Sequence, residues 1–132
     1  MARPEALVEG GVIDRCEVIG GDMFKAVPAG ADAYIIKRVL MDWGDDQATT
    51  ILRNCAAVMP AVGKVLVVEM LMSPGNGPSP GKPFDILMLL NQRGGRIRTE
   101  AELRALFTAA GLRLMRVIAT PSPNSILEGV PA

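Results

Sequence analysis

The sequence predicts one α/β domain, and three observations lead to this fold class. Apolar runs of strand length alternate with segments of helical periodicity along the 132 residues. The hydrophobic fraction of 49% allows a chain of this length to bury a compact core. The last two predicted strands are joined by a turn too short for a helical crossover. We therefore expect a mostly parallel sheet that ends in an antiparallel strand pair.

The first third of the chain contains one helix end and two strand signals. Residues 4–10 have the pattern of a helix that stops at Gly10-Gly11, and residues 16–19 are predicted as a short strand. Residues 33–40 are mostly apolar and β-branched, as expected of a strand covered on both faces.

The middle of the chain predicts a helix, a strand and a loop. Asp45 can cap a helix that ends near Pro60 and carries an apolar stripe of Ile51, Leu52, Cys55, Val58 and Met59. Residues 64–71 have the clearest strand pattern. The Gly/Pro/Ser-rich residues 73–83 are predicted to form an exposed loop of the kind that often borders a site.

The last third predicts two helices and two strands. A short helix is expected over residues 84–91, and a second helix should begin at Thr99, where Glu102 completes a capping box. Gly111 should end that helix. Residues 112–120 and 125–128 then form the predicted antiparallel pair.

Composition excludes several classes of function. Lysine plus arginine equal aspartate plus glutamate at 14 each, so we expect neither nucleic acid nor an anionic membrane surface as a partner. No apolar run approaches the ~20 residues that cross a bilayer. The polar amino terminus lacks the apolar stretch of a secretory signal, which favours the cytoplasm as the location.

The cysteine and histidine counts limit the chemistry. Cys16 and Cys55 are too few and too far apart for a disulfide framework or a zinc site, so both are expected to be reduced core residues, and no metal site is predicted. Histidine is absent. A nucleophile activated by histidine, a histidine-ligated metal and an imidazole base are therefore excluded within this sequence.

Six short motifs occur in order along the chain. They are GGDMF at residues 20–24, ADAYIIK at 31–37, DWGDD at 42–46, ILRNC at 51–55, GKVLVVE at 63–69 and GGRIRT at 94–99. Together they resemble the family of caffeic acid, isoflavone and bacterial polyketide or hydroxyneurosporene O-methyltransferases. The resemblance implies a Rossmann-like class I methyltransferase sheet, S-adenosylmethionine as the cofactor, and a small-molecule hydroxyl acceptor of the aromatic, polyketide or carotenoid type.

The resemblance also assigns four cofactor residues. Asp22 would accept a hydrogen bond from the adenine amino group and Met23 would pack on the adenine ring, which suits a carboxylate and a polarizable thioether. Lys37 and Trp43 would lie beside the cofactor. From the residues alone, a helix or turn cap followed by a core methionine is the favoured interpretation of Asp22 and Met23. The equally weighted alternatives for Lys37 and Trp43 are a charge at a sheet edge and a core-packing residue.

The catalytic positions of the family are only partly kept. Family members have a histidine base before Asp-Trp, where this chain has Met41, and a thioether cannot accept the proton of the acceptor hydroxyl. Losing a general base commonly lowers the rate by ~10²–10⁴. Of two family glutamates that flank the histidine, the first matches Glu69 and the second falls on Ile97. Glu69 is thus the one predicted catalytic residue.

The match begins after the first two strands of the methyltransferase sheet. The Gly-Gly pairs at residues 10, 20 and 94 lack the G-x-G spacing after a strand that a tight approach to a cofactor needs. We therefore expect residues 1–132 to be the carboxy-terminal part of a catalytic domain, without the dimerisation domain or the Gly-rich motif.

Three functions are compatible with this pattern. The chain is an enzyme portion completed by another polypeptide, a methyltransferase relative that binds partners or ligands without catalysis, or a remnant without activity. An isolated chain is expected to be inactive, and to self-associate or bind a complementing chain, because its strand at residues 33–40 would be left at an open sheet edge.

Overall fold

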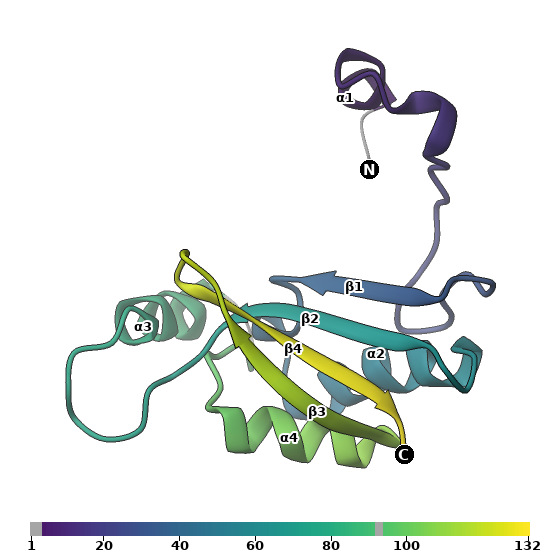
Figure 1. Ribbon diagram of the computed structural model, residues 1–132. Helices are drawn as coiled ribbons and strands as arrows, with labels where there is room; N and C mark the ends of the chain where they lie inside the picture. The colour runs from purple at the N-terminus through teal and green to yellow at the C-terminus, as the bar shows by residue number, and fades with distance from the viewer. Residues whose placement is uncertain (1–3, 92–93) are drawn as a thin grey trace.

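A four-stranded sheet organises the molecule (Figure 1). The computed structural model describes residues 4–91 and 94–132. The strands have the spatial order β1-β2-β4-β3. Their bounds are Ala33–Lys37 for β1, Lys64–Met70 for β2, Leu112–Ala119 for β3 and Asn124–Pro131 for β4. The helices are α1 (Pro4–Glu9), α2 (Asp45–Val58), α3 (Gly81–Asn91) and α4 (Glu100–Ala109), with short 3₁₀ turns η1 (Ile13–Arg15) and η2 (Leu40–Asp42).

The strand pairing confirms the α/β class and corrects one detail. β1 and β2 are parallel, whereas β4 runs antiparallel to both β2 and β3. The antiparallel closing pair is therefore confirmed. The expectation of a mostly parallel sheet is wrong for the described strands, because β4 enters the sheet between β2 and β3 and contributes both of its edges to antiparallel ladders.

The core lies between the sheet and the helices α2 and α4, which cover the same face (Figure 1). Leu52 of α2, Leu103 and Phe107 of α4, and Val65 and Leu127 of the central strands are fully buried. The packing is closest at Gly129 of β4, where a Cβ atom would lie 2.3 Å from the Phe107 ring. Only glycine allows this approach.

The helix starts depend on local geometry. The capping box at Thr99 is confirmed: Thr99 and Glu102 exchange both hydrogen bonds that define it. The predicted cap at Asp45 is wrong, because Gly44 occupies that position and the Asp45 carboxylate instead binds Arg96 and Arg98. Helix α3 begins at Gly81, before the predicted start, because proline is tolerated in a first helical turn.

Strand β1 is shorter and more exposed than predicted. It ends at Lys37 because Arg38 has a left-handed backbone with φ of 54°. Ile36 is buried against the core, but Ile35 on the other face is 69% exposed. The expectation that this strand is covered on both faces is therefore wrong for the described structure.

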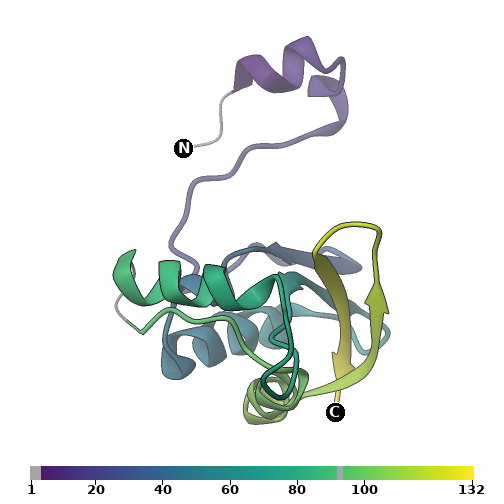
Figure 2. The ribbon, with the colours of Figure 1, turned by 90° about the vertical axis from the view of Figure 1, so that its left-hand side faces the viewer.

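The amino-terminal helix lies apart from the sheet. Figures 1 and 2 show α1 and η1 together, joined to the sheet by an extended segment. The helix before Gly10-Gly11 is confirmed, but residues 16–19 form no strand and are exposed. A strand needs a neighbour for its backbone groups, and no described strand lies beside this segment. Cys16 is consequently exposed, contrary to prediction, whereas Cys55 is buried as expected.

None of the helices within residues 4–91 and 94–132 has the length and apolar character that crossing a membrane requires.

Candidate functional site

Glu69 sits at the carboxyl end of β2 with its side chain enclosed. The residue is 2% exposed, and its Oε1 accepts a hydrogen bond from the main-chain amide of Met41 at 3.0 Å. Burial raises the pKa of Glu69, and the Met41 amide and the positive charge of Arg98 oppose that rise only in part. The Glu69 side chain therefore holds the main chain of η2 in place. Its ionisation is less favourable than that of an exposed glutamate.

Met41 and Ile97 belong to one buried apolar group. Four residues form this methionine cluster: Met41, Met70, Met88 and Ile97, with Met72 and Phe84 packed against it. Met41 is 2% exposed and Ile97 is 5% exposed. The fold thus brings together three positions that are far apart in the sequence: Met41, Glu69 and Ile97. The Met41 amide binds the Glu69 carboxylate, and the Met41 side chain packs in the methionine cluster.

Arg98 is the residue that holds this region together, and sequence reasoning missed it. Its side chain is completely buried. It donates to the carbonyl oxygens of Leu40 at 2.8 Å and Trp43 at 2.7 Å, and to the Asp45 carboxylate at 2.9 Å. Burial of Asp45 alone would raise its pKa, but hydrogen bonds from Arg98 and Arg96 outweigh this and lower it. No local pattern marks Arg98, because arginine is almost never fully buried unless it is paired, and its partners lie more than 50 positions away in the sequence.

Backbone bonds complete the attachment of residues 96–98. The Arg96 amide donates to the Met41 carbonyl oxygen, and the Met72 amide donates to the Arg98 carbonyl oxygen, both at 2.9 Å. The Ile97 amide donates to the Asp85 carboxylate of α3 at 2.8 Å. The segment before α4 therefore connects η2, the end of β2 and α3.

Two of the predicted cofactor residues line one cavity. Met23 and Lys37 border a cavity of about 230 Å³ beside β1, together with Tyr34, Ile36 and Cys55 among other side chains. The Met23 carbonyl oxygen accepts a hydrogen bond from Asn54 of α2 at 2.8 Å, which fixes the turn that carries Met23. The lining is mainly apolar, with Lys37 at the carboxyl end of β1 as its charged member.

Asp22 lies next to that cavity but does not line it. Its carboxylate caps the turn by accepting from the Phe24 amide at 3.0 Å, and it lies 3.7 Å from the Lys25 ammonium group. It borders a neighbouring hollow with Gly20 and Gly21. The carboxylate is about half exposed and so remains accessible to a ligand.

Trp43 connects the two groups of predicted residues. Its ring meets the Phe24 ring edge-on, with centroids 4.8 Å apart and planes at 82°. Its carbonyl oxygen accepts from Arg98. The turn that carries Asp22 and Met23 therefore packs against the same segment that positions Met41.

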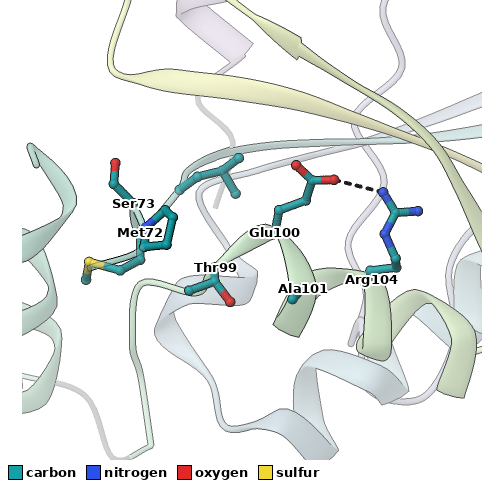
Figure 3. A pocket seen from close by; sticks show the side chains of 8 residues that line it. Met72, Ser73, Thr99, Glu100, Ala101 and Arg104 are labelled. Atoms are coloured by element: carbon teal, nitrogen blue, oxygen red, sulfur yellow. Dashed lines mark hydrogen bonds and ion pairs between the residues drawn. The ribbon is translucent and has the colours of Figure 1, made fainter.

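A larger cavity contains none of the predicted site residues. About 580 Å³ in volume, it lies between the end of β2 and the start of α4 (Figure 3). Its lining residues are Leu71, Met72, Ser73, Pro74, Thr99, Glu100, Ala101 and Arg104. Glu100 and Arg104 are joined by an ion pair of 2.8 Å. The loop at residues 73–83 thus borders a cavity, as loops of this composition often do.

Comparisons with known proteins agree on one family. The family model described as "O-methyltransferase domain" matches residues 2–113. The phenazine O-methyltransferase PhzM of Lysobacter antibioticus is 45% identical over 98% of this chain, which corresponds to 38% of that protein. The (iso)eugenol O-methyltransferase of Clarkia breweri is 36% identical over 95% of this chain and 35% of its own length.

Solved structures give the same result. The chain is similar to the structure of LaPhzM with a TM-score of 0.92 and 45% identity, covering 98% of this chain and 39% of that one. It is similar to CalO1, a methyltransferase of calicheamicin biosynthesis in its SAH-bound form, with a TM-score of 0.81, 49% identity, and coverage of 88% of this chain and 34% of that one. This chain thus spans between a third and two fifths of these proteins.

Proposed function

This chain belongs to the O-methyltransferase domain family, and from that membership we propose that it is the carboxy-terminal part of a unit that methylates a hydroxyl group of a small molecule. The methyl donor is S-adenosylmethionine, in keeping with structures of relatives that hold this compound or its demethylated product. The acceptor is an aromatic, polyketide or carotenoid-like alcohol or phenol. Residues 1–132 contribute the sheet half described above.

One observation carries the proposal: Met23 and Lys37, assigned to the cofactor by resemblance, meet at a single cavity although they come from different segments. Asp22 lies beside it with an accessible carboxylate, and Trp43 packs on the turn that holds both. In this proposal Asp22 accepts from the adenine amino group, Met23 packs on the adenine ring, and Lys37 and Trp43 border the cofactor.

This chain lacks a general base that could remove the proton of the acceptor hydroxyl group. The acceptor oxygen attacks the sulfonium methyl carbon, the carbon–sulfur bond breaks, and the hydroxyl proton must go to a base. Met41 has no titratable atom. The Glu69 carboxylate lies beside Met41, but one of its oxygens is bound to the Met41 amide. We therefore propose that Glu69 positions η2, and that the chain by itself has little or no transfer activity.

A second candidate is a methyltransferase-like domain that binds without catalysis. The methionine cluster favours it, because both family positions that would carry a base and its partner, Met41 and Ile97, are occupied by packed apolar side chains. Such a cluster stabilises a fold and offers no proton acceptor.

Calorimetric titration with S-adenosylmethionine tests both candidates. The chain is titrated alone and after mixing with the preceding segment of a close relative's catalytic domain. The first candidate predicts micromolar binding and methyl transfer only in the mixture. Binding in the mixture without transfer, even after Met41→His, supports the second candidate. Absence of binding in a mixture shown to form a complex contradicts the first.

A further inference from the structure

The region around Met41 is apolar, although the acceptor hydroxyl would lose its proton there. The four side chains of the methionine cluster are each at most 9% exposed. Thioether and hydrocarbon groups cannot take up a proton at neutral pH. The sequence contains no histidine that could reach this position from another segment of the chain. Methyl transfer beside Met41 must therefore proceed without a base from this cluster.

Charged groups around the cluster hold main-chain atoms in place. Glu69 of β2 accepts from the Met41 amide at 3.0 Å, and Asp85 of α3 accepts from the Ile97 amide at 2.8 Å. Arg98 donates to two carbonyl oxygens at the two ends of η2. These three side chains support the segments that form the cluster, and each is already bound to the protein.

A cation is positioned beside the cluster by the chain itself. The Arg38 guanidinium carbon lies 5.5 Å from the centroid of the Phe84 ring, and Phe84 packs against the methionine cluster. Arg38 has a left-handed backbone with φ of 54°, a costly conformation that recurs at functional sites when it occurs outside glycine. Its amide donates to the Val68 carbonyl oxygen at 3.0 Å, which fixes this turn. Arg38 thus brings a permanent positive charge to an apolar region.

We propose that the acceptor is an acidic phenol or enol that is already an anion when it binds, so that the protein needs no general base. This inference rests on the proposed methyl transfer and narrows its acceptor. The anionic oxygen forms the bond to the methyl carbon, the carbon–sulfur bond breaks, and its electron pair remains on sulfur. The hydroxyl proton has already passed to water before binding, so no proton moves in the transfer step.

An apolar surrounding favours this reaction. The negative charge on oxygen and the positive charge on sulfur disappear together in the transfer step. Opposite charges attract each other more strongly away from water, and the loss of both charges is easier there. Arg38 offsets the cost of moving the anion out of water. The methionine cluster and Arg38 therefore select an ionised acceptor, whereas an ordinary phenol or alcohol would keep its proton at this site.

Two acceptors of similar size and different acidity test the inference. The protein is the complex of this chain with the preceding segment of a relative's catalytic domain. The acceptors are 2-hydroxy-1,4-naphthoquinone, an enol that is ionised at neutral pH, and 2-naphthol, which keeps its proton there. The wild-type rate should be constant with the quinone around neutral pH, and should rise with the ionised fraction of 2-naphthol as the pH increases. Met41→His should raise the neutral rate with 2-naphthol by ~10²-fold or more and should change the rate with the quinone by less than about threefold.

The outcomes separate this inference from methyl transfer itself. A base supplied from elsewhere, such as Asp42 beside Met41, would make the wild-type rate with 2-naphthol independent of pH from neutral upward. That result, or an equal gain from Met41→His with both acceptors, overturns the inference and leaves the transfer function standing. Absence of transfer to either acceptor, in the wild type and in Met41→His alike, overturns both.

Absorption spectroscopy gives a reading that requires no turnover. The quinone changes colour when it ionises, so a titration measures the affinity of its anion in the presence of S-adenosylhomocysteine. Arg38→Gln should weaken this affinity by about tenfold or more, and should leave the affinity for 2-naphthol nearly unchanged. Arg113→Gln is the matched control, because Arg113 is an exposed arginine of β3, at the opposite edge of the sheet from β1. Equal anion affinities of the two variants would refute the selection of an anion by Arg38. Circular dichroism checks that each variant is folded.

Discussion

The carboxylate of Glu69 accepts a hydrogen bond from the main-chain amide of Met41 at 3.0 Å, across 28 positions of sequence. This contact joins the end of β2 to η2. It places Glu69, the predicted catalytic residue, against the main chain of Met41, the position at which the family is expected to have its histidine base. Glu69 is therefore a structural support for that position whether or not a base is present there.

Restoring a histidine at Met41 should recover activity in a complete enzyme. We expect a chimera, in which this chain replaces the matching part of an active relative, to turn over slowly and to gain ~10²-fold or more with Met41→His, because an imidazole can take the hydroxyl proton. Cofactor affinity should change little. Single-turnover rates and calorimetric affinities measure the two effects. An unchanged rate in a chimera that binds both ligands would mean that the missing proton acceptor is not the defect.

Glu69 should lower stability as pH rises. Its pKa is raised by burial above the ordinary 4.5, so the folded state binds its proton more tightly than the unfolded state. Its contribution is therefore fully present below the unfolded pKa and is lost as pH rises through the folded pKa. Relative to Glu69→Gln, the wild-type free energy of unfolding should fall as the pH rises above 4.5.

Urea titrations at several pH values give the difference in the free energy of unfolding between the wild type and Glu69→Gln. Asp45 and Glu102, whose lowered pKa values have the opposite effect on the pH dependence, cancel in this difference because both proteins contain them. Glutamine retains an oxygen that can accept from the Met41 amide. Parallel pH curves for the two proteins would show that Glu69 does not titrate in this range.

Removing Arg98 should destabilise the fold strongly. Arg98→Met leaves the carbonyl oxygens of Leu40 and Trp43 without their buried donor, so we expect a loss of about 3 kcal/mol or more in urea unfolding. The control is Lys25→Met, which removes only an exposed ion pair with Asp22 and should change stability little. Similar losses in the two variants would contradict the central role of Arg98.

Gly129 should not tolerate a methyl group. Gly129→Ala places a carbon atom within 2.3 Å of the Phe107 ring and 3.0 Å of a Val65 methyl group, so β4 or α4 must shift. Overpacking of this kind typically costs about 1–3 kcal/mol. Gly77→Ala, where nothing lies within 4 Å, should be nearly neutral. Thermal unfolding followed by circular dichroism compares the two, and equal melting temperatures would mean that the core adjusts at this point without cost.

Features that depend on neighbours in sequence were predicted well. The Thr99 capping box needs only residues within one helical turn, and the strand at β2 is recognisable because a run of apolar β-branched residues has few alternatives. The short turn between β3 and β4 also implied their antiparallel pairing, which the structure confirms. The O-methyltransferase resemblance came from six motifs in order and is supported by the family match.

The tertiary structure decided what depends on distant partners. Residues 16–19 have a strand pattern but form no strand, because backbone hydrogen bonds need a neighbour that no local pattern supplies. Asp45 was predicted to cap a helix, but in the folded chain its carboxylate binds Arg96 and Arg98, which are far away in the sequence. The sequence by itself determined the capped helix that starts at Thr99, the strand β2, the antiparallel pairing of β3 and β4, and the family. Only the folded chain decided that Met41, Glu69 and Ile97 meet in one buried region, because that proximity is created by packing between segments and not by their spacing.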